Sequence, residues 1–407
     1  MRILVVGSGA REHALAWRLA QSPACDELHA APGNPGIARI GFCHPVRAED
    51  AEGLLALCRS LPIDLVVVGP EVPLVAGVAD VLRRGGVAVF GPGREAARIE
   101  GSKSFAKEVM QAAGVPAAPT LSIARPPCVI KVDGLAAGKG VFLCRTNEEL
   151  EAGLKAAAAY GDGLVIEELL EGEELSVFAL CDGVQAIPLP AAQDFKRAGD
   201  GDTGPNTGGM GSYSPVADTA EVDEILDLVH RPVLAELAGR GAPFVGALFA
   251  GLMRTEDGIH VLEFNCRFGD PEAQSILPLI EGDLPGALAA AAAGSLGGQD
   301  FEAVAGAAVT VVVAGGGYPA ESDTGTPIAG VDEAEAEGAL VFHAGTARQG
   351  ERLVTNGGRI LGVTGIGDDL AAARELAYRA VEHISFEGAR WRTDIALAAA
   401  EGSKVGG

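Results

Sequence analysis

Short apolar runs alternate with helical patterns over the N-terminal part of the chain. Buried strands are predicted at 3–6, 28–31, 65–68 and 87–90, with helices near 11–21, 49–60 and 73–84. This alternation is typical of a parallel sheet covered by helices on both faces. Each predicted strand ends in a loop rich in Gly or Pro, and ligands bind at the carboxyl ends of such strands. We therefore predict a doubly wound α/β domain over residues 1–99, with a ligand crevice at one sheet edge.

The pattern changes after a helix that is predicted to begin near Ser102 and end at Gly114. Strands with hairpin-like joins then indicate a small antiparallel lid with α+β structure near 115–185; they are predicted at 128–132, 141–144, 164–167, 175–181 and 184–189. A loop dense in Gly, Asp, Asn and Thr follows at 193–214, and loops of this length are usually functional.

The remaining pattern completes a three-domain plan. A hairpin is predicted from 244–252 and 259–264, and a helix is predicted to begin at 284. Further strands are predicted at 307–314, 339–343 and 359–364, before a helix near 369–384. The predicted fold class is thus α/β, with a central domain over 100–300 and a C-terminal mixed α/β domain over 301–407.

Composition narrows the class of partner. The 407 residues carry a formal net charge of −24, which argues against nucleic acid because neutralising its phosphates needs a basic surface. The longest early apolar run, at 3–6, is too short for a signal peptide or a membrane span. The seven cysteines form no C-x-x-C pair, as expected for free thiols in a reducing cytoplasm. We therefore expect a cytoplasmic protein with no membrane partner. The acidic composition leaves a small anionic substrate open, because a few local Arg and Lys side chains can form a positive pocket.

Gly7 and Gly9 follow the first strand and invite comparison with a dinucleotide-binding turn. Glu12 stands where the third glycine of that motif would be, and no acidic residue ends the second strand, so a nicotinamide cofactor is disfavoured. Two interpretations remain open at this point. The backbone amides before the first helix could hold an anion, or the glycines could only let strand and helix approach closely.

A glycine-rich loop at 134–140 joins two predicted strands and carries Lys139. Its spacing is not that of a Walker A loop, and Gly140 stands where a Ser or Thr would meet Mg²⁺. A hairpin that closes over phosphates fits the pattern better. Lys131, within the apolar strand that enters the loop, needs an anion or a carboxylate partner because a lone buried charge is costly.

Glu263 and Asn265 lie two residues apart on a predicted strand, so they share one face of it. A carboxylate beside an amide oxygen suits a hard cation that also binds phosphate. Arg267, just beyond, could neutralise a transferring phosphoryl group. No His/Cys spacing for zinc and no nucleophile elbow is found in the sequence.

Several of these segments together resemble the glycinamide ribonucleotide synthetase (phosphoribosylamine–glycine ligase) family of the ATP-grasp superfamily. They are residues 9–14, 68–71, 100–103, 131–140, 202–211, 263–272 and 355–359. The resemblance runs from the first strand to near residue 395. The 263–265 pattern alone marks only the superfamily, whereas the loop at 202–211 is specific to this family.

The resemblance implies ATP-dependent joining of glycine to 5-phosphoribosylamine through glycyl phosphate, a step of purine biosynthesis, by a monomeric enzyme that uses ATP and Mg²⁺ or Mn²⁺. It implies ATP contacts from Lys103, Lys131, Gly138, Lys139, Gly140, Glu167, Glu168, Leu170 and Glu174. It implies metal ligands at Glu263 and Asn265, and catalytic roles for Arg267, Asp194 and Lys131. Substrate contacts are implied at Gly7, Gly9, Asn34, Glu71, Asp194 and Arg267.

Two departures from the family pattern stand out. Phe195 occupies a position where the family usually has His, and the lid is short both before Lys131 and before Leu164. The alternatives are another ATP-grasp carboxylate–amine ligase, a non-catalytic nucleotide-binding module, and a nicotinamide oxidoreductase. The 202–211 loop speaks against the first, and the presence of Lys131, Glu263 and Asn265 speaks against the second.

Overall fold

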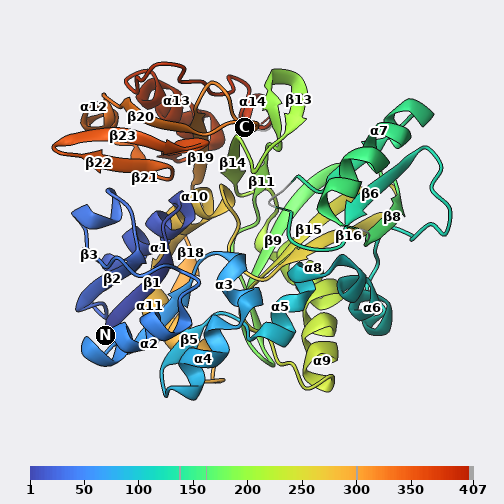
Figure 1. Ribbon diagram of the computed structural model, residues 1–407, viewed down its shortest axis with the longest axis horizontal. Coiled ribbons are helices and arrows are strands. Elements are labelled where there is room, and N and C mark those ends of the chain that lie inside the picture. The colour runs from blue at the N-terminus through green and yellow to red at the C-terminus, as the bar shows by residue number, and fades with distance from the viewer. Residues whose placement is uncertain (137–138, 162, 299–300, 403–407) are drawn as a thin grey trace.

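The computed structural model describes residues 1–136, 139–161, 163–298 and 301–402. An N-terminal unit and a C-terminal unit lie one above the other, and the middle of the chain extends to one side of them (Figure 1). The N-terminal unit is a five-stranded parallel sheet, and the doubly wound prediction is confirmed there. Its strand order is β3 (Phe42–Cys43), β2 (Glu27–Pro32), β1 (Arg2–Gly7), β4 (Leu65–Val68) and β5 (Ala88–Phe90).

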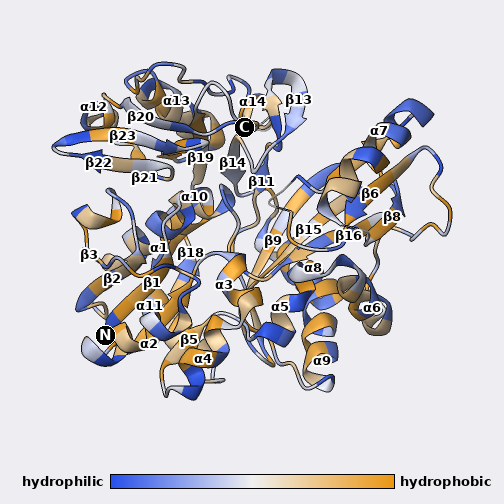
Figure 2. Cartoon of the chain, in the orientation of Figure 1, coloured by the Kyte–Doolittle hydropathy of each residue, from blue (hydrophilic) through white to orange (hydrophobic). Residues whose placement is uncertain are grey.

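The strands of this sheet are apolar because helices cover both faces (Figure 2). The helices of this unit are α1 (Ala10–Ala20), α2 (Ala51–Ser60), α3 (Glu71–Ala76) and α4 (Val78–Arg84). The single helix predicted near 73–84 is wrong, since Gly77 separates α3 from α4. Gly77 adopts φ 88° and ψ 25°, the left-handed conformation that ends a helix and that glycine adopts without steric cost.

Three strands between residues 128 and 168 form a small antiparallel sheet; with the helix that packs on it, we call it the lid unit. Its strand order is β7 (Val141–Cys144), β6 (Cys128–Val132) and β8 (Leu164–Glu168), and α7 (Asn147–Ala157) packs on it. The strands predicted at 175–181 and 184–189 do not belong to it. They form β9 (Glu173–Asp182) and β10 (Ala186–Pro188) in the larger sheet β10-β9-β15-β16, with β15 at Val245–Thr255 and β16 at Gly258–Asn265.

This correction has a physical reason. Residues 177–181 of β9 have no exposed surface, so side chains on both faces of the strand are packed against other elements. A lid unit with a single layer of covering structure could not bury both faces. The predicted hairpin of β15 and β16 is confirmed, and its strands pair in antiparallel register from Phe249 with Asn265 to Thr255 with Gly258.

The segment 193–214, expected to be a loop, is partly ordered into strands. They are β11 (Gln193–Asp194), β12 (Arg197–Gly199), β13 (Thr203–Asn206) and β14 (Gly211–Ser214). Two of them join the C-terminal sheet, whose order is β11-β14-β19-β24-β21, with β19 at Ala307–Ala314, β24 at Arg359–Gly367 and β21 at Leu340–His343. Sheet membership therefore crosses the boundary that we expected at residue 300.

The three strands predicted in the C-terminal unit and its helix α13 (Leu370–Val381) are confirmed. A second sheet, missed by the sequence, consists of β20 (Asp323–Pro327), β23 (Arg352–Gly357) and β22 (Thr346–Gln349). The remaining helices and strands are α5 (Arg94–Gly101), α6 (Lys103–Ala113), α8 (Thr219–Ile225), α9 (Arg231–Gly239), α10 (Glu272–Ile276), β17 (Ile280–Gly282), α11 (Leu284–Ala292), β18 (Phe301–Ala303), α12 (Val331–Ala336) and α14 (Leu397–Gly402). None of the helices in the described ranges is long and apolar enough to cross a membrane.

Candidate active site

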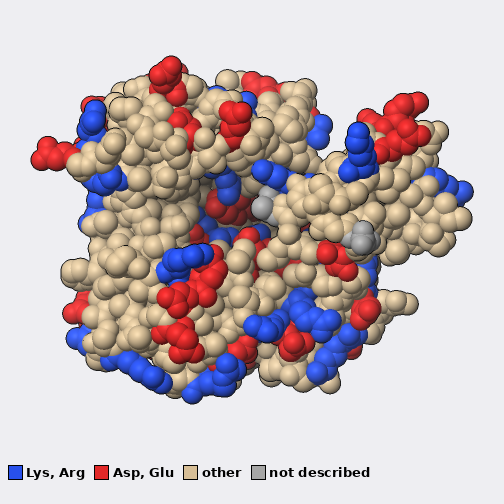
Figure 3. Space-filling view, viewed as in Figure 1, with Lys and Arg blue, Asp and Glu red and all other residues tan. Residues whose placement is uncertain are grey.

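A cleft of about 1650 Å³ lies where the lid unit, the central sheet and both outer units meet. Acidic and basic side chains are visible together inside it, in the hollow at the middle of the surface (Figure 3). Most of the residues singled out from the sequence line this cleft: Glu71, Lys103, Lys131, Lys139, Gly140, Glu167, Glu168, Leu170, Glu174, Asp194, Glu263, Asn265 and Arg267. The structure thus brings together residues from distant parts of the chain.

Lys103 and Glu263 form one charged pair of the cleft. Lys103 is the first residue of α6, where Ser102 caps the helix by accepting a hydrogen bond from the Phe105 amide. Its Nζ lies 2.5 Å from Oε2 of Glu263 on β16. Burial opposes ionisation of Glu263, but the charge and hydrogen bond of Lys103 outweigh it and lower the pKa of this carboxyl to about 2. Glu263 is therefore an anion at neutral pH.

Glu263 and Asn265 offer oxygen atoms of the kind that Mg²⁺ prefers. Asn265 Oδ1 accepts a hydrogen bond from Arg267 Nη2 at 3.1 Å, so its amide oxygen is oriented by this contact. The described residues contain no group of three or more His, Cys, Asp or Glu side chains that could hold a metal by themselves. The pair fits a cation that keeps water or phosphate oxygens as its other ligands, and it does not fit a closed structural metal site.

Lys131 has the carboxylate partner that the sequence predicted. Its Nζ lies 2.5 Å from Oε2 of Glu167 and also donates to the carbonyl oxygen of Leu262 at 2.6 Å. The other oxygen of Glu167 lies 2.5 Å from Nζ of Lys107. The Glu167 carboxylate is only 2% exposed, so its charge is compensated by two lysines rather than open to a ligand. Glu168 and Leu170, at the end of β8 and beyond it, still line the cleft.

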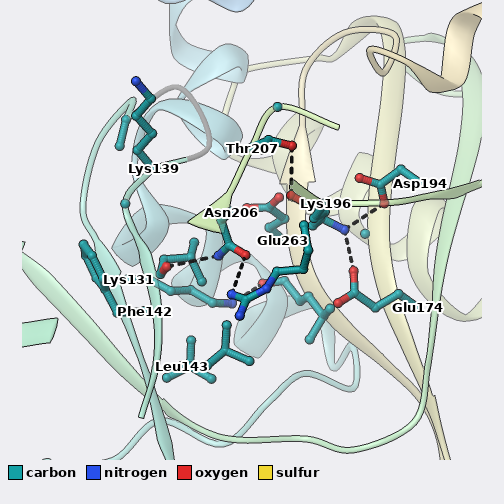
Figure 4. Close-up of a pocket in the computed structure, with 18 of the residues that line it drawn as sticks. Lys131, Lys139, Phe142, Leu143, Glu174, Asp194, Lys196, Asn206, Thr207 and Glu263 are labelled. Carbon is teal, nitrogen blue, oxygen red and sulfur yellow. Dashed lines mark hydrogen bonds and ion pairs between the residues drawn. The ribbon is translucent and has the colours of Figure 1, made fainter. Parts of the chain in front are cut away.

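Asp194 and Glu174 converge on Lys196 in the cleft (Figure 4). Lys196 Nζ lies 2.9 Å from Oδ1 of Asp194 and also pairs with Oε2 of Glu174. Burial raises the pKa of Asp194 above its usual range, although Lys196 acts in the opposite direction. The pKa of Lys196 is raised well above its usual value, since the two carboxylates outweigh the effect of burial.

Arg267 links the central sheet to the N-terminal unit. Its Nη2 lies 3.0 Å from Oε1 of Glu100, and its Nε lies 3.4 Å from Oε2 of Glu71. Although burial disfavours the guanidinium, Glu100 and Glu71 raise its pKa. Two arginines, Arg267 and Arg11, lie near Glu71. Their charges outweigh the effect of burial and lower the pKa of the Glu71 carboxyl. Arg267, Arg11, Glu71 and Glu100 form a partly buried charge cluster at one wall of the cleft.

The glycine-rich loop at 202–211 is held from both sides. Asn206 Nδ2 donates to the carbonyl oxygen of Val141 in the lid unit at 3.5 Å (Figure 4). From the C-terminal unit, Tyr318 accepts a hydrogen bond from the Gly208 amide at 2.8 Å, and Arg359 donates to the Gly208 carbonyl at 2.6 Å. Lys139 and Gly140 line the cleft near this loop, whereas Gly138 lies outside the described residues.

Three residues expected to contact substrate are not part of the cleft lining: Gly7, Gly9 and Asn34. The Asn34 amide donates to the carbonyl oxygens of Ser8 and His343, and its oxygen accepts from the amides of Gly36 and Ile37. These structural contacts use its hydrogen-bonding capacity, so a direct role of its side chain in binding substrate is not supported.

Contacts with Glu12 account for the glycines at positions 7 and 9 in the first turn. The Gly9 amide donates to Glu12 Oε2 at 2.6 Å, so this carboxylate takes a position where an external anion would bind. A side chain at Gly7 would overlap Glu12, so close packing accounts for this glycine. Gly9 itself adjoins Asp270, which does line the cleft.

Phe195 makes a contact that the sequence did not predict. The guanidinium carbon of Arg392 lies 4.9 Å from the centre of its ring, a cation–π arrangement. Arg392 is 1% exposed and pairs with Asp394 at 2.7 Å and with Asp202 at 2.8 Å. The aromatic ring thus packs on the residue that fixes the β12–β13 hairpin to the C-terminal unit.

Sequence reasoning gave no role to several basic residues in or beside the cleft. Among them, Lys196 and Arg359 line the cleft, and Lys107 pairs with Glu167. Lys107 could have been found, because it lies four residues after Lys103 and so on the same face of α6. Arg359, which pairs with Asp270 at 2.9 Å, belongs to a segment quoted for its family pattern but without a role. Only the three-dimensional structure places it opposite Asp270.

Comparison with known proteins gives three matches in chain order. The Phosphoribosylglycinamide synthetase N domain matches residues 1–100, the ATP-grasp (A) domain matches 101–273, and the C domain matches 308–398. A phosphoribosylamine–glycine ligase from Streptomyces coelicolor is 50% identical over 98% of this chain and 100% of its own. One from Rhizobium meliloti is 47% identical over 97% of this chain and 98% of its own.

Solved structures agree with these matches. The crystal structure of a phosphoribosylamine–glycine ligase from Thermotoga maritima has a TM-score of 0.84 and 35% identity, and the alignment covers 97% of this chain and 100% of that one. A biotin carboxylase domain from Hydrogenobacter thermophilus, at 18% identity and a TM-score of 0.70, shares the fold. The expected ATP-grasp architecture is confirmed. With all three domains matched in order and relatives similar along their whole length, this chain belongs to the phosphoribosylglycinamide synthetase family.

Proposed function

We propose that this chain joins glycine to 5-phosphoribosylamine at the expense of ATP, giving glycinamide ribonucleotide, ADP and phosphate in purine biosynthesis. The observation that carries the proposal is that Lys103, Lys131 and Arg267 line one cleft together with Glu263, in a chain that matches this ligase family throughout. Three cations beside an acidic ligand suit a transferring phosphoryl group, whose charge must be stabilised in the transition state.

Each residue has a role that its position supports. Lys103, Lys131, Lys139 and Gly140 would hold the ATP phosphates, and the chain near Glu168 and Leu170 would hold adenine. Glu174 would accept from the ribose hydroxyls, and Glu263 and Asn265 would hold the divalent cation. When bound, that cation would offset negative charge on the phosphates. Glu167 would act through Lys131, which it positions.

Asp194 would bind the ammonium group of glycine, and Arg267 would bind the carboxylate of glycine. The glycine carboxylate attacks the γ-phosphorus, ADP leaves, and the amine of phosphoribosylamine then displaces phosphate from the acyl carbon. No protein nucleophile is required, so the contribution of the residues is orientation and charge stabilisation. Glu71 would face phosphoribosylamine, together with Asp270 at the point where it adjoins Gly9. The expectation of a monomer stays a prediction.

A coupled assay of ADP release tests the function. Release should require ATP, a divalent cation, glycine and phosphoribosylamine, and should stop when either of the last two is omitted. Bicarbonate in place of glycine should give no turnover. Equal turnover with bicarbonate, or ADP release that ignores phosphoribosylamine, would contradict the proposal and favour another ligase of the same fold.

A further inference from the structure

Glu272 is an ionisable group of the cleft to which the proposed reaction gives no role. It is the first residue of α10, it lines the cleft, and it is 3% exposed. Glu100 and Glu167, the other buried glutamates of the lining, each lie within 4.0 Å of an Arg or Lys nitrogen. Within the described ranges of the chain, Glu272 has no such partner.

The surroundings of Glu272 keep its carboxyl in place without neutralising it. Its Oε1 accepts a hydrogen bond at 3.1 Å from Ser176, a buried residue on β9. A side chain at position 269 would overlap Oε2, so Gly269 leaves room for the second oxygen. The carboxyl is thus held by Ser176 and by a hydrogen bond from the backbone of Glu272 itself. Each carboxylate oxygen has a second lone pair, so the group can still take up a proton.

Two of the charged groups around Glu272, Asp194 and Arg267, are those proposed to bind glycine. Burial comes first and Asp194 second in raising the pKa of Glu272 to about 7, whereas Lys196 and Arg267 act in the opposite direction. Asp194 lies on β11, Lys196 lies just before β12, and Arg267 lies in the segment after β16. Glu272 is therefore within electrostatic reach of both Asp194 and Arg267. A general base is most effective when it titrates close to the working pH.

Amide formation needs such a group. When the amine of phosphoribosylamine attacks the carbonyl carbon of glycyl phosphate, a C–N bond forms and the nitrogen becomes positively charged. The bond from that carbon to the phosphate oxygen then breaks, and phosphate leaves with the bonding electrons. One proton must leave the nitrogen for the neutral amide to result. The carboxylates to which the proposed reaction gives a role, Asp194, Glu263 and Glu71, are all held in ion pairs.

We propose that the Glu272 carboxylate accepts the proton that the attacking amine loses, and that Ser176 positions it for this transfer. The proposal rests on the proposed ligase function. It concerns only the second half-reaction, since the first half-reaction, from glycine and ATP to glycyl phosphate, releases no amine proton. Glu272 is therefore expected to affect amide formation and to have little effect on glycine activation.

Two assays on the full chain separate these steps. In Glu272→Gln, amide formation from phosphoribosylamine should fall by about 10²–10⁴-fold, the usual contribution of a general base. Hydroxylamine is a weakly basic nucleophile that traps acyl phosphates without a base, so formation of glycine hydroxamate with ATP and glycine should stay within a few fold of the unsubstituted chain. Glu281→Gln, on an exposed residue of β17, is the matched control and should change neither rate.

The pH dependence supplies a readout that a structural role would not alter. The acid limb of kcat/KM for phosphoribosylamine should disappear in Glu272→Gln. In Ser176→Ala it should move to higher pH, because the carboxylate loses a hydrogen bond that stabilises its charged form. Ser176→Ala also keeps the test valid if Glu272→Gln does not fold.

Three results would overturn the proposal: unchanged amide formation in Glu272→Gln, loss of hydroxamate and amide formation to the same extent, or an acid limb that Ser176→Ala leaves in place. If the unsubstituted chain forms hydroxamate from glycine but does not use phosphoribosylamine, the ligase assignment fails instead. The two failures are therefore distinguishable.

Discussion

Lys139, in the loop of the lid unit, donates a hydrogen bond from Nζ to the carbonyl oxygen of Pro319, at 3.2 Å and 180 positions further along the chain. Pro319 belongs to the C-terminal unit and lines the cleft together with Ala320. The lid unit therefore contacts the far side of the cleft through this lysine and through the bond from Asn206 to Val141. Both contacts bridge the cleft, so they depend on the position of the lid unit.

We predict that bound nucleotide strengthens this bridging, because phosphate oxygens can accept hydrogen bonds from Lys139 and the neighbouring amides. Hydrogen exchange over 128–168 should slow on adding Mg-ATP, while β1 and β4 change little. Lys139→Met should reduce this protection and raise the KM for ATP by about tenfold or more. Lys155→Met, on an exposed lysine of α7, should do neither. Lid amides that exchange as slowly as those of β1 and ignore nucleotide would contradict the prediction.

The second prediction concerns the metal site. Glu263→Gln removes the negative charge that both Lys103 and a divalent cation require, so turnover should fall at least about 100-fold. The free energy of unfolding should also decrease by about 1–3 kcal/mol without ligands, because Lys103 loses its partner in a partly buried site. Steady-state kinetics and urea unfolding measure both effects. Glu256→Gln, at the exposed turn of the same hairpin, should change neither. Retained activity would place the cation elsewhere.

A third prediction concerns Phe195 and Arg392. If their contact stabilises the fold, Phe195→Leu and Arg392→Met should be non-additive, with a coupling free energy of about 0.5–2 kcal/mol in a double-mutant cycle measured by urea unfolding. Phe195→Leu combined with Arg98→Met should be additive, since Arg98 packs on the Phe105 ring instead. Additivity in the first cycle would show that the ring is only a packing contact.

A fourth prediction follows from the raised pKa of Glu272, which is about 7 in the folded chain. An unfolded glutamate titrates near 4.3, so between these values the folded state binds the extra proton and its stability falls as pH rises. Glu272→Gln has no such proton to lose. Its free energy of unfolding, relative to the unsubstituted chain without ligands, should therefore increase from pH 4.5 to pH 7, by an amount on the order of 1–3 kcal/mol. A difference independent of pH over this range would contradict the shift.

Much of the fold could be predicted because its signals are local. The runs at 3–6 and 65–68 are apolar at every position, and strands buried on both faces have this pattern. The site residues Glu263 and Asn265 were found for a similar reason, because alternation along one strand fixes their common face. The need of Lys131 for a carboxylate could also be predicted, although its identity as Glu167 could not.

The rest depended on contacts between distant segments. Asn34 lies in a Pro-Gly-Asn turn of the kind that binds ligands. Its side-chain amide, however, donates hydrogen bonds to the carbonyl oxygens of Ser8 and His343, and only the folded chain brings His343 close. Nothing local distinguishes Glu272 from Asp270 in their shared motif. Arg359 pairs with Asp270, whereas among the described residues no Arg or Lys nitrogen lies within 4.0 Å of the Glu272 carboxylate. The partner of Asp270 lies nearly 90 positions away in the chain.

The pairing of β14 with β19 bears on how the chain can be divided. β14, at residues 211–214, lies beside β19 in a sheet whose other strands of equal or greater length, β19, β24 and β21, come from beyond residue 306. A fragment of 308–398, the part that matches the C domain, would leave the edge of β19 without its neighbour, and exposed sheet edges promote aggregation. A fragment that ended before 307 would leave β14 without the strand it pairs with. The stretch that matches the C domain and the stretch that can fold alone therefore differ, and autonomous folding should require the whole chain.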